Sequence, residues 1–125
     1  MLLDTCALLW LVHDRSKLSD ETLQKMDDAS ILYVSAITGF EIGLKYKAGK
    51  LQLPMPPTEW VEGVLESYDI SVIDLNMGIC IKATELPPIH RDPCDRFIIA
   101  TALLRALPVV TVDHRFAEYG VEVLK

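Results

Sequence analysis

One helix dominates the pattern of this sequence, and it begins in the charged stretch His90–Arg96. Asp92 followed by Pro93 predicts a helix start, because aspartate caps helix N-termini and proline fits the first helical position. Asp95 then falls in the first turn, where the helix dipole favours a negative charge. Residues 97–106 are apolar on nearly every face, which is typical of a helix enclosed in a core. A carboxylate at the start of such a helix serves either capping or chemistry.

Strand-like and helix-like segments alternate along the rest of the chain. Short β-branched or apolar runs predict strands at residues 2–3, 31–34, 70–75, 108–113 and 121–123. Apolar spacing and capping residues predict helices at 5–13, from 19, and at 36–48, 58–68, 76–86 and from 93. This alternation predicts an α/β fold, with a parallel sheet covered by helices on both faces. With 125 residues, half of them hydrophobic, we expect one domain spanning 1–125.

Composition excludes several classes of protein. No run is apolar for the ~20 residues that a membrane span needs. The start Met1–Asp4 lacks a basic region, so we expect no signal peptide. Cys6, Cys80 and Cys94 form no C-x-x-C motif, which favours a reducing cytoplasm with the thiols buried as small hydrophobes. The formal charge of −6 argues against a protein that coats nucleic acid without sequence preference. It does not argue against a nuclease whose acids are concentrated at one site.

Acidic residues recur at the predicted strand ends. Asp4 and Ser35 directly follow predicted strands, and Asp113 ends the predicted strand at 108–113. In a parallel sheet these positions share one edge, and ligands bind beyond the carboxyl ends of the strands. Helix starts lie at that edge too, so Asp95, and Glu41 within two turns of Ser35, are expected to join them. Four carboxylates would repel each other unless a cation lay between them.

Oxygen ligands without histidine or cysteine at ligand spacing favour Mg²⁺ or Mn²⁺ over zinc. Such a cation orients a water and stabilises negative charge on a phosphodiester. Taken singly, Asp4, Asp92 and Asp113 could instead be ordinary N-caps, and Glu41 could pair with Lys45 at i, i+4. Spacing alone leaves both interpretations open.

Four segments together resemble the PIN-domain ribonucleases, and among them the VapC-like toxins of toxin–antitoxin pairs. These segments are Leu2–Trp10, Ser35–Ile42, His90–Arg96 and Thr111–Asp113, and they follow the order of the family. The resemblance covers essentially the whole chain. It implies a PIN-like three-layer α/β/α sandwich with a central, mostly parallel sheet of about five strands. It also implies a Mg²⁺- or Mn²⁺-dependent endoribonuclease.

Carried over residue by residue, the resemblance makes Asp4, Glu41, Asp95 and Asp113 the catalytic acids. Asp4 would be the central metal ligand, Asp95 would join it directly or through water, and Asp113 would be a further ligand. Glu41 would complete the site or position the attacking water.

The resemblance and the neighbouring residue types also suggest contacts to other molecules. Thr5, Lys45, Arg96 and Thr111 are candidates for contact with the substrate, although each has a local structural alternative. Expected partners are RNA, a cognate antitoxin that lays a peptide over the acidic edge, and a second copy of the chain. For the last, Gly39 and Gly43 suggest a closely packed helix face.

Other interpretations remain at this point. A phosphatase with an aspartyl nucleophile would want a second aspartate two residues after Asp4, where Cys6 stands. A PIN-like module that only binds partners would have no need of all four acids. His90 could be a base, but a structural hydrogen bond fits it better, because a metal-activated water needs no histidine.

Overall fold

Five short parallel strands form the centre of the molecule, which we describe from a computed structural model covering residues 1–125. The strand order is β3-β2-β1-β4-β5, and every neighbouring pair is parallel. The strands are β1 Leu2–Leu3, β2 Leu32–Ser35, β3 Ile70–Ile73, β4 Val109–Val110 and β5 Val123–Leu124. The predicted α/β class and the sheet of about five parallel strands are therefore confirmed.

Six α-helices and two short 3-10 helices surround the sheet. The α-helices are α1 Thr5–His13, α2 Asp20–Asp28, α3 Ile37–Lys47, α4 Pro57–Ser67, α5 Met77–Glu85 and α6 Pro93–Arg105. The 3-10 helices are η1 Arg15–Lys17 and η2 His114–Tyr119. Asp92 caps α6, with its side chain accepting the Cys94 N–H at 2.9 Å, as the sequence predicts. No helix in the chain is both long and apolar enough to span a membrane.

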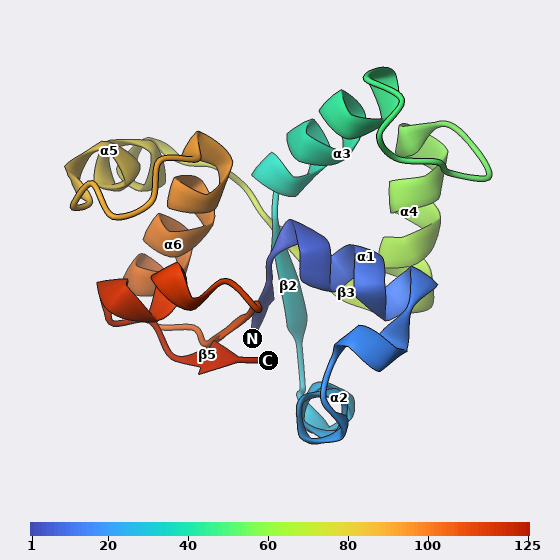
Figure 1. The fold of residues 1–125 in the computed structure, drawn as a ribbon, viewed down its shortest axis with the longest axis horizontal. Helices are drawn as coiled ribbons and strands as arrows, with labels where there is room; N and C mark the ends of the chain where they lie inside the picture. Colours follow the sequence, from blue (N-terminus) through green and yellow to red (C-terminus); the bar gives the residue numbers. More distant parts are fainter.

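The two faces of the sheet carry separate apolar cores. Leu2 points to one face, where it packs with residues of α5, α6 and η2, including the fully buried Phe116. Leu3 points to the other face and packs with residues of α1 to α4. This division follows from the strand geometry, because successive side chains of a strand point to opposite faces. Figure 1 shows the resulting layers, with α5 and α6 on one side of the sheet and α1 and α4 on the other.

The bounds of some predicted strands and the burial of the cysteines differ from the structure. The predicted strand 108–113 contains only Val109–Val110, because the Thr111 hydroxyl accepts the Asp113 N–H at 3.0 Å and begins the turn into η2. The prediction of buried thiols is wrong for all three cysteines. Cys6 is exposed, and Cys80 and Cys94 are half-buried. Cys6 is exposed because it occupies the second position of α1, at the mouth of a cleft.

Candidate functional site

The four acids singled out in the sequence line one cleft at the carboxyl edge of the sheet. Asp4, Glu41, Asp95 and Asp113 share this cleft with Thr5 and Lys45, among others. They come from four different elements: the end of β1, the second turn of α3, the first turn of α6 and the segment after β4. Parallel strands bring these elements to one edge, as the topology predicts.

Asp4 serves both as a cap and as part of the cleft. Its Oδ1 accepts the Ala7 N–H at 2.8 Å, which caps α1. The residue is only 6% exposed. Burial raises the pKa of Asp4, and the charges of Glu41 and Asp113 raise it further, while hydrogen bonds from Thr111 and Ala7 oppose the change. Capping therefore coexists with a carboxylate whose negative charge is costly, which is a feature of functional sites.

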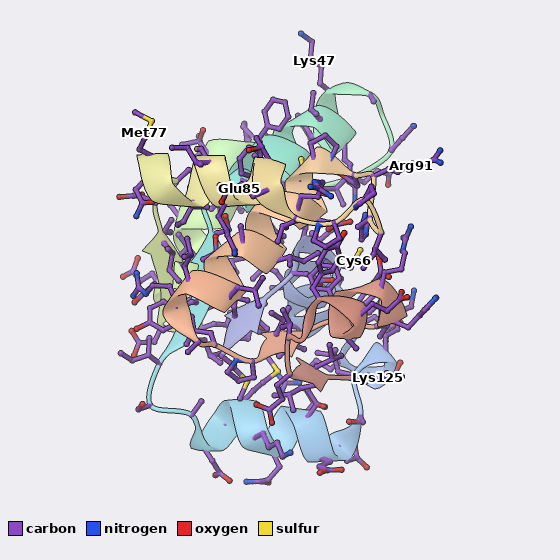
Figure 2. All side chains as sticks on the ribbon, turned by 90° about the vertical axis from the view of Figure 1, so that its left-hand side faces the viewer. Cys6, Lys47, Met77, Glu85, Arg91 and Lys125 are labelled. Carbon is purple, nitrogen blue, oxygen red and sulfur yellow. The ribbon has the colours of Figure 1, made fainter.

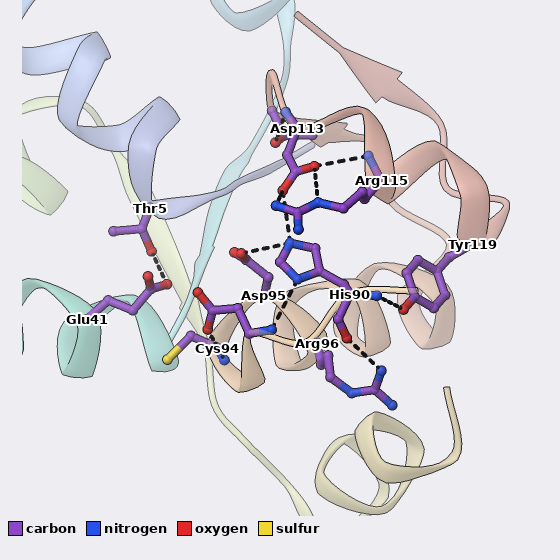
Figure 3. A network of polar contacts seen from close by, with 11 residues as sticks. Thr5, Glu41, His90, Cys94, Asp95, Arg96, Asp113, Arg115 and Tyr119 are labelled. Carbon is purple, nitrogen blue, oxygen red and sulfur yellow. Dashed lines mark hydrogen bonds and ion pairs between the residues drawn. The ribbon is translucent and has the colours of Figure 1, made fainter. Parts of the chain in front are cut away.

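Glu41 reaches the cleft from α3 and is held there by buried hydroxyls. Thr5 Oγ1 donates to Glu41 Oε1 at 2.7 Å (Figure 3). The same hydroxyl lies 3.0 Å from Thr38 Oγ1. No ion pair joins Glu41 to Lys45, so the helical pairing considered from the sequence is not formed. Lys45 lies half-buried in the cleft wall.

Asp95 is the acid whose ionisation is most disfavoured. Burial and then the charges of Asp92, Glu41, Asp4 and Asp113 raise its pKa to about 7. Its Oδ2 lies 3.0 Å from Nε2 of His90, a side chain that is only 2% exposed. Asp92 caps α6, whereas the Asp95 carboxylate lies near the other acids of the cleft. This arrangement is the one expected if Asp92 starts the helix and Asp95 belongs to the site.

The carboxylate of Asp113 is hydrogen-bonded by two side chains, those of Arg115 and His90. Its carboxylate accepts two hydrogen bonds from the Arg115 guanidinium, at 3.0 and 2.9 Å, and one from His90 Nε2 at 2.8 Å (Figure 3). Burial by itself would raise the pKa of Asp113, but the hydrogen bonds from Arg115 and His90 outweigh it and lower the pKa well below its usual range. Asp113 is therefore ionised in the cleft while Asp95 resists ionisation.

Arg96 is turned away from the cleft and into the backbone. All five of its N–H donors point at carbonyl oxygens, those of Ala83, Leu86, Pro87 and His90, at 2.7 to 3.1 Å. It has no donor left for a substrate phosphate.

Two further candidates for substrate contact are also enclosed. The hydroxyl of Thr5 serves Glu41, and that of Thr111 accepts the Asp113 N–H. These residues are 3% and 0% exposed. Of the four candidates for substrate contact, the structure leaves Lys45 at the cleft surface.

The donor set of the cleft fits a hard divalent cation. Its acids supply carboxylate oxygens, which Mg²⁺ and Mn²⁺ prefer. Cys6 lines the same cleft. Although the residue is exposed, partial desolvation of its thiol and then the charge of Asp4 raise the pKa of the thiol, so it stays protonated and is a poor ligand. Burial first, and then the charges of neighbouring acids, raise the pKa values of Asp4 and Asp95, and a cation between the carboxylates would offset both effects.

Three residues of the site were not identified from the sequence. Arg115 holds Asp113, Thr38 supports Thr5, and Tyr119 accepts the His90 N–H and donates to the Pro87 carbonyl. An arginine two residues after a predicted site acid was the available signal for Arg115. Thr38 and Tyr119 carry no comparable signal, because their contacts are long-range.

Comparisons with known proteins agree with this fold. A sequence profile described as the PIN domain matches residues 1–122. Ribonuclease VapC22 of Mycobacterium tuberculosis is 28% identical over 120 residues, covering 95% of this chain and 91% of that protein. Among solved structures, VapBC2 from Rickettsia felis bound to a promoter DNA fragment gives a TM-score of 0.70 at 16% identity, covering 100% and 98% of the two chains. DNA-bound VapBC from Salmonella typhimurium gives 0.68 at 21% identity, covering 98% and 94%.

Proposed function

The chain belongs to the PIN-domain family, and from that premise we propose that it is a Mg²⁺- or Mn²⁺-dependent endoribonuclease, the toxin of a toxin–antitoxin pair. The observation that carries the proposal is the meeting of Asp4, Glu41, Asp95 and Asp113 in one cleft. A relative named as a ribonuclease and solved toxin–antitoxin complexes of the same fold support it.

In this proposal Asp4 and Asp95 hold the cation, because burial and neighbouring negative charges make the ionised form of each costly without it. The cation, when bound, activates a water and neutralises negative charge on the phosphodiester. Glu41 is fixed by the hydrogen bond from Thr5, so it orients the attacking water and accepts its proton. Lys45 at the cleft wall neutralises a neighbouring RNA phosphate, a contact that gives affinity without choosing a sequence.

The test of this function is metal-dependent cleavage of RNA by the purified chain, freed of any bound antitoxin. Structured RNA incubated with Mg²⁺ or Mn²⁺ is expected to be cut in its single-stranded loops, and a chelator is expected to stop cleavage. Electrophoresis of end-labelled RNA gives the rate and the positions of the cuts. Cleavage that persists unchanged in the chelator would contradict the proposed chemistry.

We propose that the acidic edge is also where an antitoxin binds. A peptide with a basic side chain would place its positive charge among the four carboxylates and exclude RNA. Structurally similar chains were solved within toxin–antitoxin complexes, which supports a partner of this kind. Relief of toxicity by the product of a neighbouring gene would separate a toxin from a housekeeping nuclease.

The outer face of α3 is our candidate for contact with a second copy of the chain. Phe40 and Leu44 are 58% and 51% exposed there. A Cβ added at Gly39 or Gly43 would meet no atom within 4 Å, so nothing inside the chain requires these glycines. Within one copy they only weaken the helix, by about 1 kcal/mol each relative to alanine.

Gly39→Ala and Gly43→Ala are therefore expected to raise the free energy of unfolding by about 0.5 to 1 kcal/mol each in the monomer. They are expected to weaken self-association, because the new methyl groups hold the two helices apart. Urea unfolding and sedimentation velocity measure the two effects. Gly63→Ala in α4, where an added Cβ also meets nothing, is the matched control that should leave association unchanged. Unchanged association in the α3 variants would remove this face as the interface.

A further inference from the structure

Asp113 differs from the other acids in how fully its oxygens are used. An ionised carboxylate offers about four lone-pair positions. Oδ1 accepts the backbone N–H and the Nε–H of Arg115, each at 3.0 Å. Oδ2 accepts Nη2 of Arg115 at 2.9 Å and Nε2 of His90 at 2.8 Å. Donors of the chain itself thus fill the positions at which a metal would bind (Figure 3).

His90 cannot take the place of Asp113 as a ligand. His90, Asp95 and Asp113 place potential ligand atoms within 4.8 Å of one another. The Asp92 N–H, however, donates to Nδ1 of His90 at 3.2 Å, so Nδ1 carries the lone pair of the ring. Nε2 therefore carries the hydrogen, which it donates toward the two carboxylates. Of these three groups, only Asp95 keeps an oxygen, Oδ1, that accepts nothing from the chain.

The ring of His90 is held firmly in this orientation. Its backbone N–H donates to Tyr119 at 2.7 Å, and its carbonyl accepts from Arg96 at 3.0 Å. The ring packs edge-on against Phe116, with 5.9 Å between the ring centroids. A rotation that freed a lone pair toward the cleft would break the hydrogen bond from Asp92 to the ring.

From these contacts we infer that the cleft binds one divalent cation, at Asp4 and Asp95, and that the Arg115 guanidinium occupies Asp113 in place of a second. A two-metal nuclease site needs carboxylates that serve two ions about 4 Å apart. The oxygens of Asp113 accept a bidentate pair of hydrogen bonds from the Arg115 guanidinium, so they are not available to bind a second ion. This inference rests on the proposed function and defines its metal stoichiometry.

Titration with Mn²⁺ of the wild-type protein, followed by the electron paramagnetic resonance signal of the free ion, tests the inference. The wild type is expected to bind one Mn²⁺ that is lost in Asp4→Asn, and ions that remain in that variant are counted as surface binding. In Arg115→Gln, which frees lone pairs on both oxygens of Asp113, we expect a second Mn²⁺. Its affinity should exceed that of any second site in the wild type by at least about tenfold.

Arg91→Gln is the matched control. Arg91 is exposed on the same side of the molecule as Cys6, takes part in no ion pair, and does not touch Asp113 (Figure 2). The Arg91→Gln substitution removes one positive charge, as Arg115→Gln does, and this variant should still bind one Mn²⁺ ion. Arg115 is half exposed, and circular dichroism verifies that its variant folds. As a second variant, Arg115→Lys keeps the charge but loses the fork, and should bind a second ion more weakly than Arg115→Gln.

The possible results separate the inference from the proposed function. Two specific Mn²⁺ ions in the wild type would overturn the single-ion site. So would an Arg115→Gln variant that binds one ion with unchanged affinity, or a second ion in Arg91→Gln as well. A wild type that binds no Mn²⁺ in the cleft would refute the proposed function itself, before any variant is compared.

Discussion

Replacing Asp95 with asparagine is expected to lower the rate of metal-dependent RNA cleavage by about 10²- to 10³-fold or more. The substitution keeps the shape of the side chain and removes the charge that holds the cation in the proposed function. Such a cation contributes several kcal/mol to transition-state stabilisation. An asparagine oxygen can still accept from His90 Nε2, so the surrounding network is retained. Rates measured on end-labelled RNA with saturating Mn²⁺ give the effect.

The same variant is expected to be more stable than the wild type without metal at pH 8. The pKa of Asp95 is raised to about 7 in the folded protein, above its ordinary value of 3.8, so the folded state binds this proton more tightly than the unfolded state. Stability is therefore lost as the pH rises from about 4 to 7 and stays lost above. Asp95→Asn removes that loss. Because the group is partly exposed and screened, we expect a gain of about 1 kcal/mol at pH 8 and none near pH 4.

Thermal unfolding at the two pH values measures this gain, and Mg²⁺ should stabilise the wild type but not the variant. Asp74→Asn is the matched control, because Asp74 also follows a strand, β3, but is exposed and lies outside the cleft. It should change neither cleavage nor stability. Equal cleavage by Asp95→Asn and wild type would reject the assignment of this acid to the site.

Replacing Arg96 with alanine is expected to lower the free energy of unfolding by about 3 kcal/mol or more. Its five hydrogen bonds satisfy carbonyls at the end of α5, Ala83 and Leu86, and in the loop that follows, Pro87 and His90. A charged donor contributes roughly 1.5 to 3 kcal/mol per bond, and the carbonyls left behind are partly enclosed. Urea unfolding measures the loss.

Arg96→Lys should recover little of this stability, because a lysine ammonium cannot reproduce the planar fork. Arg105→Ala, on the exposed end of the same helix and over the Tyr33 ring, is the control, with an expected cost of about 1 kcal/mol or less. If Arg96→Ala proved as mild as Arg105→Ala, the guanidinium would not be what fixes the loop carrying His90.

Much of the fold could be predicted because its signals are local. Asp92 before Pro93 places the start of α6, Ser19 and Asn76 cap α2 and α5, and Gly49 follows α3 with a positive φ of 73°. Each depends on hydrogen bonds within about four residues. The alternation of these elements then indicated the parallel sheet, and the strand ends indicated the acidic edge.

The roles of single residues needed the tertiary structure. From the sequence, Asp4 was either a cap or a site acid, whereas in the fold one oxygen caps α1 while the residue lines the cleft. Arg96 stood beside Asp95 in the sequence, yet its guanidinium serves the backbone of α5. No sequence pattern singled out Arg115, yet its guanidinium donates two hydrogen bonds to the Asp113 carboxylate.

The sequence by itself thus determined the order of elements and the edge at which the acids gather, because these follow from short-range patterns and strand direction. Its four motifs also carried the resemblance to the family that the profile match shows. Only the tertiary structure decided which acid's oxygens are taken up by donors of the chain, as those of Asp113 are. That choice depends on the orientation of the His90 ring, which Asp92, Tyr119 and Arg96 fix together. Contacts between residues up to 29 positions apart leave no periodic trace in the chain.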